Sequence, residues 1–130
     1  MLLAQISDLH VVAKGQRLFG RIDTPAFLTR AVAHLNALDP RPDFVWITGD
    51  LVDQGSPAEY AHLREILGGL QLPWALMPGN HDERSNLRQA FDETRLPRTG
   101  EFMNARPHSI FFRDEKFLNN SSSKRFLKIS

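Results

Sequence analysis

The stretch "FVWITGDLVDQGSPAEYAHLREILGG", residues 44–69, decides the fold of this chain. Its first six residues are apolar and uncharged on both faces of an extended backbone, which predicts a buried strand over residues 44–49. Ser56 and Glu59 have the spacing of a capping box, with Pro57 in the first helical turn, and two glycines follow the last apolar position. The stretch therefore predicts a strand followed by a helix.

Strand and helix signals recur on both sides of this stretch. Residues 2–7 and 73–78 are also short apolar runs bounded by polar or turn residues, and we predict a strand in each. Between the first two strands lies "DTPAFLTRAVAHLNALDP", with apolar residues at helical spacing. Thr24 is the expected cap of this helix, and Pro25 suits its first turn.

A third helix is expected to begin near Asp82 or Ser85. This alternation predicts an α/β fold with a parallel sheet and right-handed crossovers. The pattern fades after the third helix, where residues 108–112 ("HSIFF") predict one more strand and residues 113–130 resemble a loose, polar and basic tail. We expect one domain over residues 1–112, followed by that tail.

The composition indicates a soluble globular protein and excludes several classes of site. The chain has 130 residues, 42% hydrophobic and 24% charged, and no cysteine, so disulfides and thiolate metal sites are excluded. No apolar run approaches the roughly 20 residues that cross a bilayer, and the start does not resemble a signal peptide. We therefore expect a cytoplasmic protein with no membrane partner.

The charge distribution argues against a nucleic-acid partner. Residues 1–112 contain 11 Lys and Arg against 13 Asp and Glu, whereas residues 113–130 contain 5 against 2. The body is slightly acidic and has no broad basic face of the kind that binds nucleic acid. A basic end of this size is more often a solvated tail than a phosphate-binding arm.

Each predicted strand ends in groups that bind metals or move protons. The first strand ends in "SDLH" with Asp8 and His10, the second in "GDLVD" with Asp50, and the third in "GNHD" with Asn80 and His81. In an open parallel sheet the carboxyl ends of the strands form the ligand-binding edge, so we expect these side chains to meet there.

The donor types indicate a hydrolytic metal site. Carboxylate and amide oxygens mixed with imidazole suit Mn, Fe, Zn or Co. Two such ions roughly 3.5 to 4 Å apart can clamp a phosphate and activate water, which is the chemistry of phosphate ester hydrolysis. Asp53 is expected in the turn after the second strand, with a supporting role near the metals as the alternative. We interpret His34 and His62, which lie within helices, as structural.

The motifs D-x-H, G-D-x-x-D and G-N-H-D, in this order and spacing, resemble those of the calcineurin-like metallophosphoesterases. The flanking segments "RLFGRIDT" and "RPDFVWITGDLVDQGSPAEY" are similar to bacterial class III cyclic-nucleotide phosphodiesterases and the related glycerophosphodiesterases. The resemblance covers residues 1–102. It implies the N-terminal half of an αββα sandwich, two divalent metal ions, and a small phosphodiester as substrate.

The resemblance also implies roles for the five strand-end residues. By motif, Asp8 and His10 would bind one metal, Asp50 would bridge both, and Asn80 would bind the second. His81 would be the catalytic residue that faces the scissile phosphate, where it would stabilise the transition state or protonate the leaving oxygen.

The chain departs from the family after the third motif. Family members carry a further ligand histidine and a Gly-His-x-His motif, and His108 has neither the spacing nor the neighbours of these residues. The domain is thus expected to be incomplete, with apolar surface that favours a homo-oligomer. Two alternatives to the phosphodiesterase remain: a non-catalytic truncated fragment that binds metal weakly, and a nuclease-like metallophosphoesterase.

Overall fold

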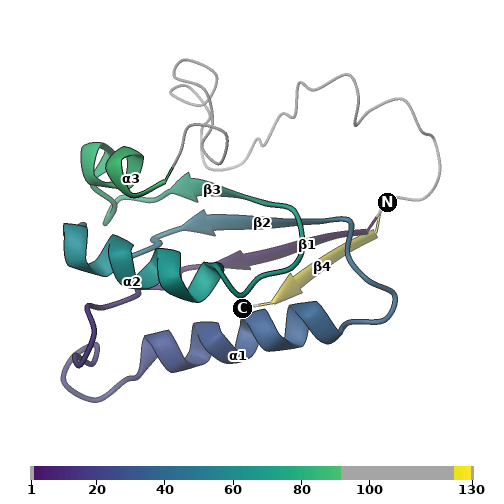
Figure 1. Cartoon of the computed structure of the whole chain (residues 1–130), viewed down its shortest axis with the longest axis horizontal. Coiled ribbons are helices and arrows are strands. Elements are labelled where there is room, and N and C mark those ends of the chain that lie inside the picture. Colours follow the sequence, from purple (N-terminus) through teal and green to yellow (C-terminus); the bar gives the residue numbers. More distant parts are fainter. Residues whose placement is uncertain (1, 92–124, 130) are drawn as a thin grey trace.

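The structure is a computed structural model that describes residues 2–91 and 125–129 (Figure 1). In chain order its elements are β1 (Leu2–Ser7), α1 (Thr24–Ala37), β2 (Phe44–Gly49), α2 (Pro57–Leu67), β3 (Trp74–Pro78), α3 (Arg84–Ala90) and β4 (Arg125–Ile129). The four strands form one sheet in the order β3-β2-β1-β4, and all three neighbouring pairs are parallel. The predicted α/β fold of alternating strand-helix units is confirmed.

The core lies between the sheet and the two longer helices. Residues at alternate positions of β1 and β2 point toward α1 and α2, so that Ala4, Ile6, Val45 and Ile47 are buried. The helices meet them with apolar residues at helical spacing: Leu28, Val32 and Leu35 from α1, and Tyr60, Leu63 and Leu67 from α2. This packing makes the sheet a rigid base whose strand ends all point the same way (Figure 1).

Helix α1 begins one residue earlier than its sequence signal. Asp23 is the cap, because its Oδ1 atom accepts a hydrogen bond from the backbone N–H of Ala26 at 3.0 Å. The expectation that Thr24 caps the helix is wrong, since Thr24 is the first helical residue. Its hydroxyl instead donates to the backbone carbonyl of His10 at 2.7 Å. An aspartate beside the threonine offers the stronger acceptor.

Helix α2 begins with the predicted capping box. The Ser56 hydroxyl accepts from the backbone N–H of Glu59 at 3.4 Å, and the Glu59 carboxylate accepts from the backbone N–H of Ser56 at 2.9 Å. Glu59 is buried, and its carboxylate also accepts from the backbone N–H of Gln54. The box therefore joins the helix to the loop that follows β2.

The structure of residues 125–129 differs from the loose tail that the sequence predicts over residues 113–130. These residues form β4, which pairs with β1 from Leu2↔Arg125 to Ile6↔Ile129, and so are not part of a loose tail. Pairing with an edge strand uses backbone groups, so it does not need the apolar pattern that residues 113–130 lack. The strand predicted over residues 108–112, and the boundary at residue 112, lie outside the described residues.

Two surface features bear on the other expectations. Leu3 and Trp46, on the sheet face opposite α1 and α2, are each only 8% exposed. The expected homo-oligomer stays a prediction. Among the residues that the structure describes, no helix is both long and apolar enough to cross a membrane.

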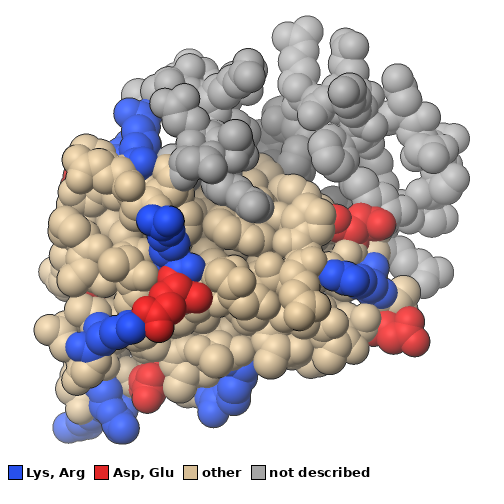
Figure 2. Space-filling model, viewed as in Figure 1, with Lys and Arg blue, Asp and Glu red and all other residues tan. Residues whose placement is uncertain are grey.

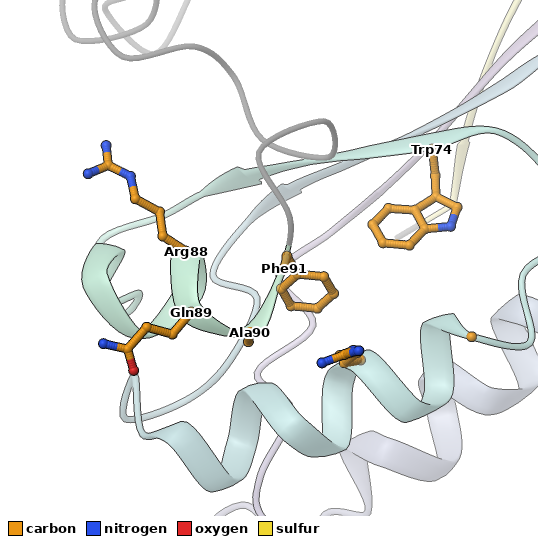
Figure 3. Close-up of a pocket in the computed structure, with 7 residues that line it drawn as sticks. Trp74, Arg88, Gln89, Ala90 and Phe91 are labelled. Carbon is orange, nitrogen blue, oxygen red and sulfur yellow. The ribbon is translucent and has the colours of Figure 1, made fainter.

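A hollow of about 460 Å³ lies between α2, α3 and β3 (Figure 3). The rings of Trp74 and Phe91 meet edge to face in it, with their centroids 6.0 Å apart. Arg88 and Gln89 also line it, but their side chains extend away from these rings (Figure 3). None of the strand-end residues lines this hollow, so it is separate from the site described next.

Candidate metal centre

The loops that follow β1 and β2 run side by side and bring their polar residues together. The backbone N–H of His10 donates to the carbonyl of Asp50 at 3.0 Å, and that of Val11 donates to the carbonyl of Leu51 at 3.1 Å. Parallel pairing thus continues past the strands and aligns the "SDLH" segment with the "GDLVD" segment. The alignment explains why residues 40 positions apart in the chain share one site.

Asp8, His10 and Asp50 form a group that fits a metal ion. One ligand atom from each lies within 4.8 Å of the other two, and His10 Nε2 is 3.6 Å from Asp50 Oδ2. Asp8 and His10 have positive φ angles of 56° and 42°. Non-glycine residues with such angles are uncommon and often lie at functional sites. Two carboxylates with one imidazole are suitable donors for the divalent ions expected from the sequence.

Gly79 allows the loop after β3 to lie directly against Asp50. A Cβ atom at position 79 would meet Asp50 Oδ1 and would come within 2.6 Å of the Asp50 backbone nitrogen. The next residues use this close approach, because the backbone N–H of His81 donates to Asp50 Oδ1 at 3.0 Å. Asp50 therefore has one oxygen fixed by the third loop and the other beside His10.

We expect Gly79→Ala to destabilise the fold by about 1 to 3 kcal/mol or more, the usual cost of overpacking, and to weaken metal binding. The added methyl group has to separate the third loop from Asp50, because its nearest neighbours include backbone atoms. Urea unfolding and metal titration measure the two effects. Gly69→Ala is the matched control, since its nearest atoms would be 3.4 and 3.7 Å away. Equal unfolding midpoints for the two variants would contradict the close-approach argument.

His81 is held by the loop after β2 and keeps one ring nitrogen on its outer side. Its Nδ1 atom lies 2.7 Å from the backbone carbonyl oxygen of Asp53, which accepts a hydrogen bond from the Nδ1–H, so Nε2 is the nitrogen left for a ligand. This hydrogen bond raises the pKa of His81 above its usual value, and the negative charges of Asp50 and Asp53 act in the same direction. The side chain is 41% exposed. It can therefore meet a ligand as a proton donor.

Asp53 belongs to the site rather than only to a turn. Its Oδ1 atom lies 3.6 Å from His10 Nδ1 and 3.9 Å from His81 Nδ1. His10, Asp53 and His81 form a second group whose ligand atoms lie within 4.8 Å of one another, and the two histidine rings meet edge to face at 4.9 Å. The geometry thus brings Asp53 into the site, as the alternative from the sequence allows.

Asn80 is exposed. Its two neighbours in the chain, Gly79 and His81, both lie against Asp50. The position of Asn80 at the rim is compatible with a ligand role. The two helical histidines lie elsewhere: His34 is exposed on α1, and His62 Nδ1 lies 2.8 Å from the carbonyl of Val12, which ties α2 to the loop after β1.

The structure adds two residues, Asp82 and Tyr60, that the motif analysis left without a role. Asp82 Oδ2 accepts from the backbone N–H groups of Leu51 and Gly79 at 3.0 and 2.8 Å, and its Oδ1 accepts from the Tyr60 hydroxyl at 2.9 Å. Tyr60 also accepts from the backbone N–H of Glu83 at 2.9 Å. Burial raises the pKa of both Asp82 and Tyr60. Together they join the third loop to the second loop and to α2.

We expect Tyr60→Phe to lower the free energy of unfolding by about 1 to 3 kcal/mol, because it leaves Asp82 Oδ1 and the Glu83 N–H without this partner. Urea unfolding of Tyr60→Phe, Asp82→Asn and the double variant measures it. The double variant should lose less than the sum of the two single losses, since the residues share a hydrogen bond. Strict additivity would show that the two residues act independently.

The family model for calcineurin-like phosphoesterases matches residues 1–127. The chain belongs to this family. It is 38% identical over 93 residues to a probable glycerophosphodiester phosphodiesterase of Arcobacter nitrofigilis, which covers 72% of this chain and 34% of that protein. Membership in this family, which the motifs predict, is confirmed.

Two further relatives of this chain differ in the substrates that their names give. A glycerophosphodiester phosphodiesterase of Enterobacter lignolyticus is 46% identical over 85 residues, which are 65% of this chain and 31% of that protein. A cAMP/cGMP dual specificity phosphodiesterase of Mycobacterium tuberculosis is 39% identical over 93 residues, with 67% and 29% covered. The chain spans about a third of the length of these curated relatives.

Proposed function

We propose that this chain carries part of a metal-dependent phosphodiesterase site whose substrate is a small phosphodiester of the cyclic-nucleotide or glycerophosphodiester type. The observation that carries the proposal is the convergence of Asp8, His10 and Asp50, with ligand atoms within 4.8 Å, beside His81. Membership in a phosphoesterase family and the names of the relatives support this choice of reaction.

In this proposal Asp8, His10, Asp50 and Asn80 would hold two divalent ions, and Asp50 would serve both. Mn, Fe, Zn and Co suit the mixture of carboxylate, amide and imidazole donors. When bound, these ions supply positive charge to the phosphate and make water a better nucleophile. The close approach of Gly79 and the hydrogen bond from the His81 backbone N–H at 3.0 Å position Asp50 within this group.

His81 acts on the leaving group. Its Nδ1–H is occupied by the Asp53 carbonyl at 2.7 Å, which orients the ring and leaves Nε2 to carry the transferable proton. Nε2–H gives its proton to the oxygen that leaves phosphorus, so that this oxygen becomes a neutral hydroxyl group and His81 becomes a neutral imidazole. General acid catalysis of this kind contributes about 10² to 10⁴ in rate.

The test is to load the full chain with Mn²⁺ and to measure metal stoichiometry and the turnover of bis(p-nitrophenyl) phosphate in the same samples. We expect hydrolysis that EDTA abolishes and that added Mn²⁺ restores. Asp8→Asn should lower both metal content and turnover. A metal-loaded chain that hydrolyses no phosphodiester would favour the non-catalytic alternative, and turnover that is unaffected by EDTA would contradict the metal site.

A further inference from the structure

The large hydrophobic side chains that are exposed in the described part of the chain all lie between residues 19 and 27. Phe19 is 82% exposed, Ile22 is 41% exposed and Phe27 is 55% exposed. Single exposed apolar residues are ordinary on protein surfaces. Two of the three, Phe19 and Ile22, lie in one tight turn after β1 and form a local patch, and such patches often mark binding sites, whereas Phe27 lies on α1 against Arg30.

The ring of Phe19 is hardly buried by the fold, so its packing does not explain why a phenylalanine stands at this position. Phe19 lies in a tight turn closed by two hydrogen bonds between Leu18 and Ile22, at 2.8 and 2.9 Å, and the buried Leu18 anchors this turn. The φ angle of Phe19 is 52°, in the left-handed region that a bulky residue adopts at a cost. Glycine or asparagine would suit that backbone better. A phenylalanine with a strained backbone angle and an exposed ring indicates that the ring contacts something outside the fold.

The turn belongs to the same end of the molecule as the metal centre. The loop that carries it joins β1 to α1, and its two ends are tied where the hydroxyl of Thr24, the first residue of α1, donates to the His10 carbonyl at 2.7 Å. In Figure 1 this loop extends beyond the carboxyl ends of β1 and β2. Phe19 is five residues from Thr24, so its Cα lies within about 18 Å of it at full extension, and the turn makes the distance shorter.

Two arginines flank the exposed ring. Arg17 and Arg21 are both exposed, and neither forms an ion pair with another residue that the structure describes. In Figure 2 Lys and Arg side chains lie at the lower left, with Asp and Glu side chains among them, where the loop between β1 and α1 lies in Figure 1. A flat aromatic face between guanidinium groups suits a ligand that is both planar and anionic, because bases stack on aromatic rings and arginine binds phosphate.

We propose that the turn Leu18–Ile22 forms the outer part of the substrate site and selects phosphodiesters that carry a nucleobase over those that carry only glycerol. Phe19 stacks against the base, while Arg17 and Arg21 attract the anion toward the strand ends. This inference rests on the proposed function and narrows its substrate class. A second copy of the chain fits the patch less well, because a symmetric contact would place the arginines of both copies together.

The test compares the affinities of AMP and glycerol 3-phosphate for the Mn²⁺-loaded full chain, measured by calorimetry. Both carry the same phosphate group, so the difference reports the base. We expect AMP to bind about fivefold or more tightly than glycerol 3-phosphate, the gain typical of one stacked base. Phe19→Gly should remove this difference and leave the affinity for glycerol 3-phosphate unchanged. Glycine accepts the φ angle of 52°, so this variant keeps the turn.

Phe27→Ala is the matched control, because it also removes an exposed phenylalanine ring. Phe27 lies outside the turn, on α1, where its ring contacts Arg30. This variant should bind AMP as the unaltered chain does. Equal affinities for AMP and glycerol 3-phosphate in the unaltered chain, or a preference for AMP that survives Phe19→Gly, would overturn this inference alone. Failure of the metal-loaded chain to bind either ligand would overturn the proposed function with it.

Discussion

Asp50→Asn is expected to remove more bound metal than any other single substitution in this chain. Asp50 is the carboxylate on which all three strand-end loops converge: its Oδ1 accepts from the His81 backbone at 3.0 Å, and its Oδ2 is 3.6 Å from His10 Nε2. Asparagine has nearly the same shape and can still accept from the His81 N–H. The fold should therefore remain, while the negative charge shared by the two proposed ions is lost.

The expected loss in affinity for Mn²⁺ is more than about 100-fold, since substitutions that only support a ligand already cost 10- to 100-fold. Titration followed by elemental analysis measures it, with unfolding curves to show that the fold is retained. Asp39→Asn is the control: it makes the same charge change at an exposed residue between α1 and β2. If Asp8→Asn empties the site while Asp50→Asn leaves it occupied, the bridging role of Asp50 is wrong.

Local signals in the sequence were sufficient for the elements that position the site. Three uncharged apolar runs and two well-marked helix starts predict β1 to β3, α1 and α2, because burial on both faces and capping leave direct traces in residue type. The sequence predicts the start of α1 one residue too late, since Asp23 and Thr24 can both cap a helix. The choice between them depends on the contact of Thr24 with His10, which is not local.

Strand β4 could not be predicted by the same reasoning. Residues 125–129 contain two cationic residues among three apolar ones and lie in a polar, basic stretch, so neither strand periodicity nor a continuous apolar run is present. Their pairing with β1 uses backbone hydrogen bonds. An edge strand of this kind is determined by the free side of β1, which the sequence of residues 125–129 does not encode.

The strand-end groups were predictable because their spacing is short and their shared edge follows from a parallel sheet. The residues that orient these groups are harder to predict from the sequence. The carbonyl of Asp53 that holds His81, and the hydroxyl of Tyr60 that holds Asp82, act across 28 and 22 residues of chain. Neither contact leaves a pattern in residue type, since a carbonyl is present at every residue and a buried tyrosine on a helix resembles an ordinary core residue.

His81→Ala is expected to lower phosphodiesterase activity by about 10² to 10⁴, the usual contribution of a positioned general acid, while metal content stays within about twofold of the unaltered chain. The basis is the orientation of the ring. Its Nδ1–H is donated to the Asp53 carbonyl at 2.7 Å, which leaves Nε2 free on a side chain that is 41% exposed. The backbone N–H that holds Asp50 Oδ1 remains in alanine, so the third loop should keep its place.

Initial rates with bis(p-nitrophenyl) phosphate and elemental analysis of the same samples separate the two quantities. His34→Ala is the matched control, because it removes an exposed histidine on α1 and should change neither. The competing reading has a structural basis, since His81 also lies with His10 and Asp53 in a group whose ligand atoms are within 4.8 Å of one another. If His81→Ala loses metal in proportion to its loss of rate, His81 is a ligand of that second group, and the proton that the leaving oxygen needs must come from another donor.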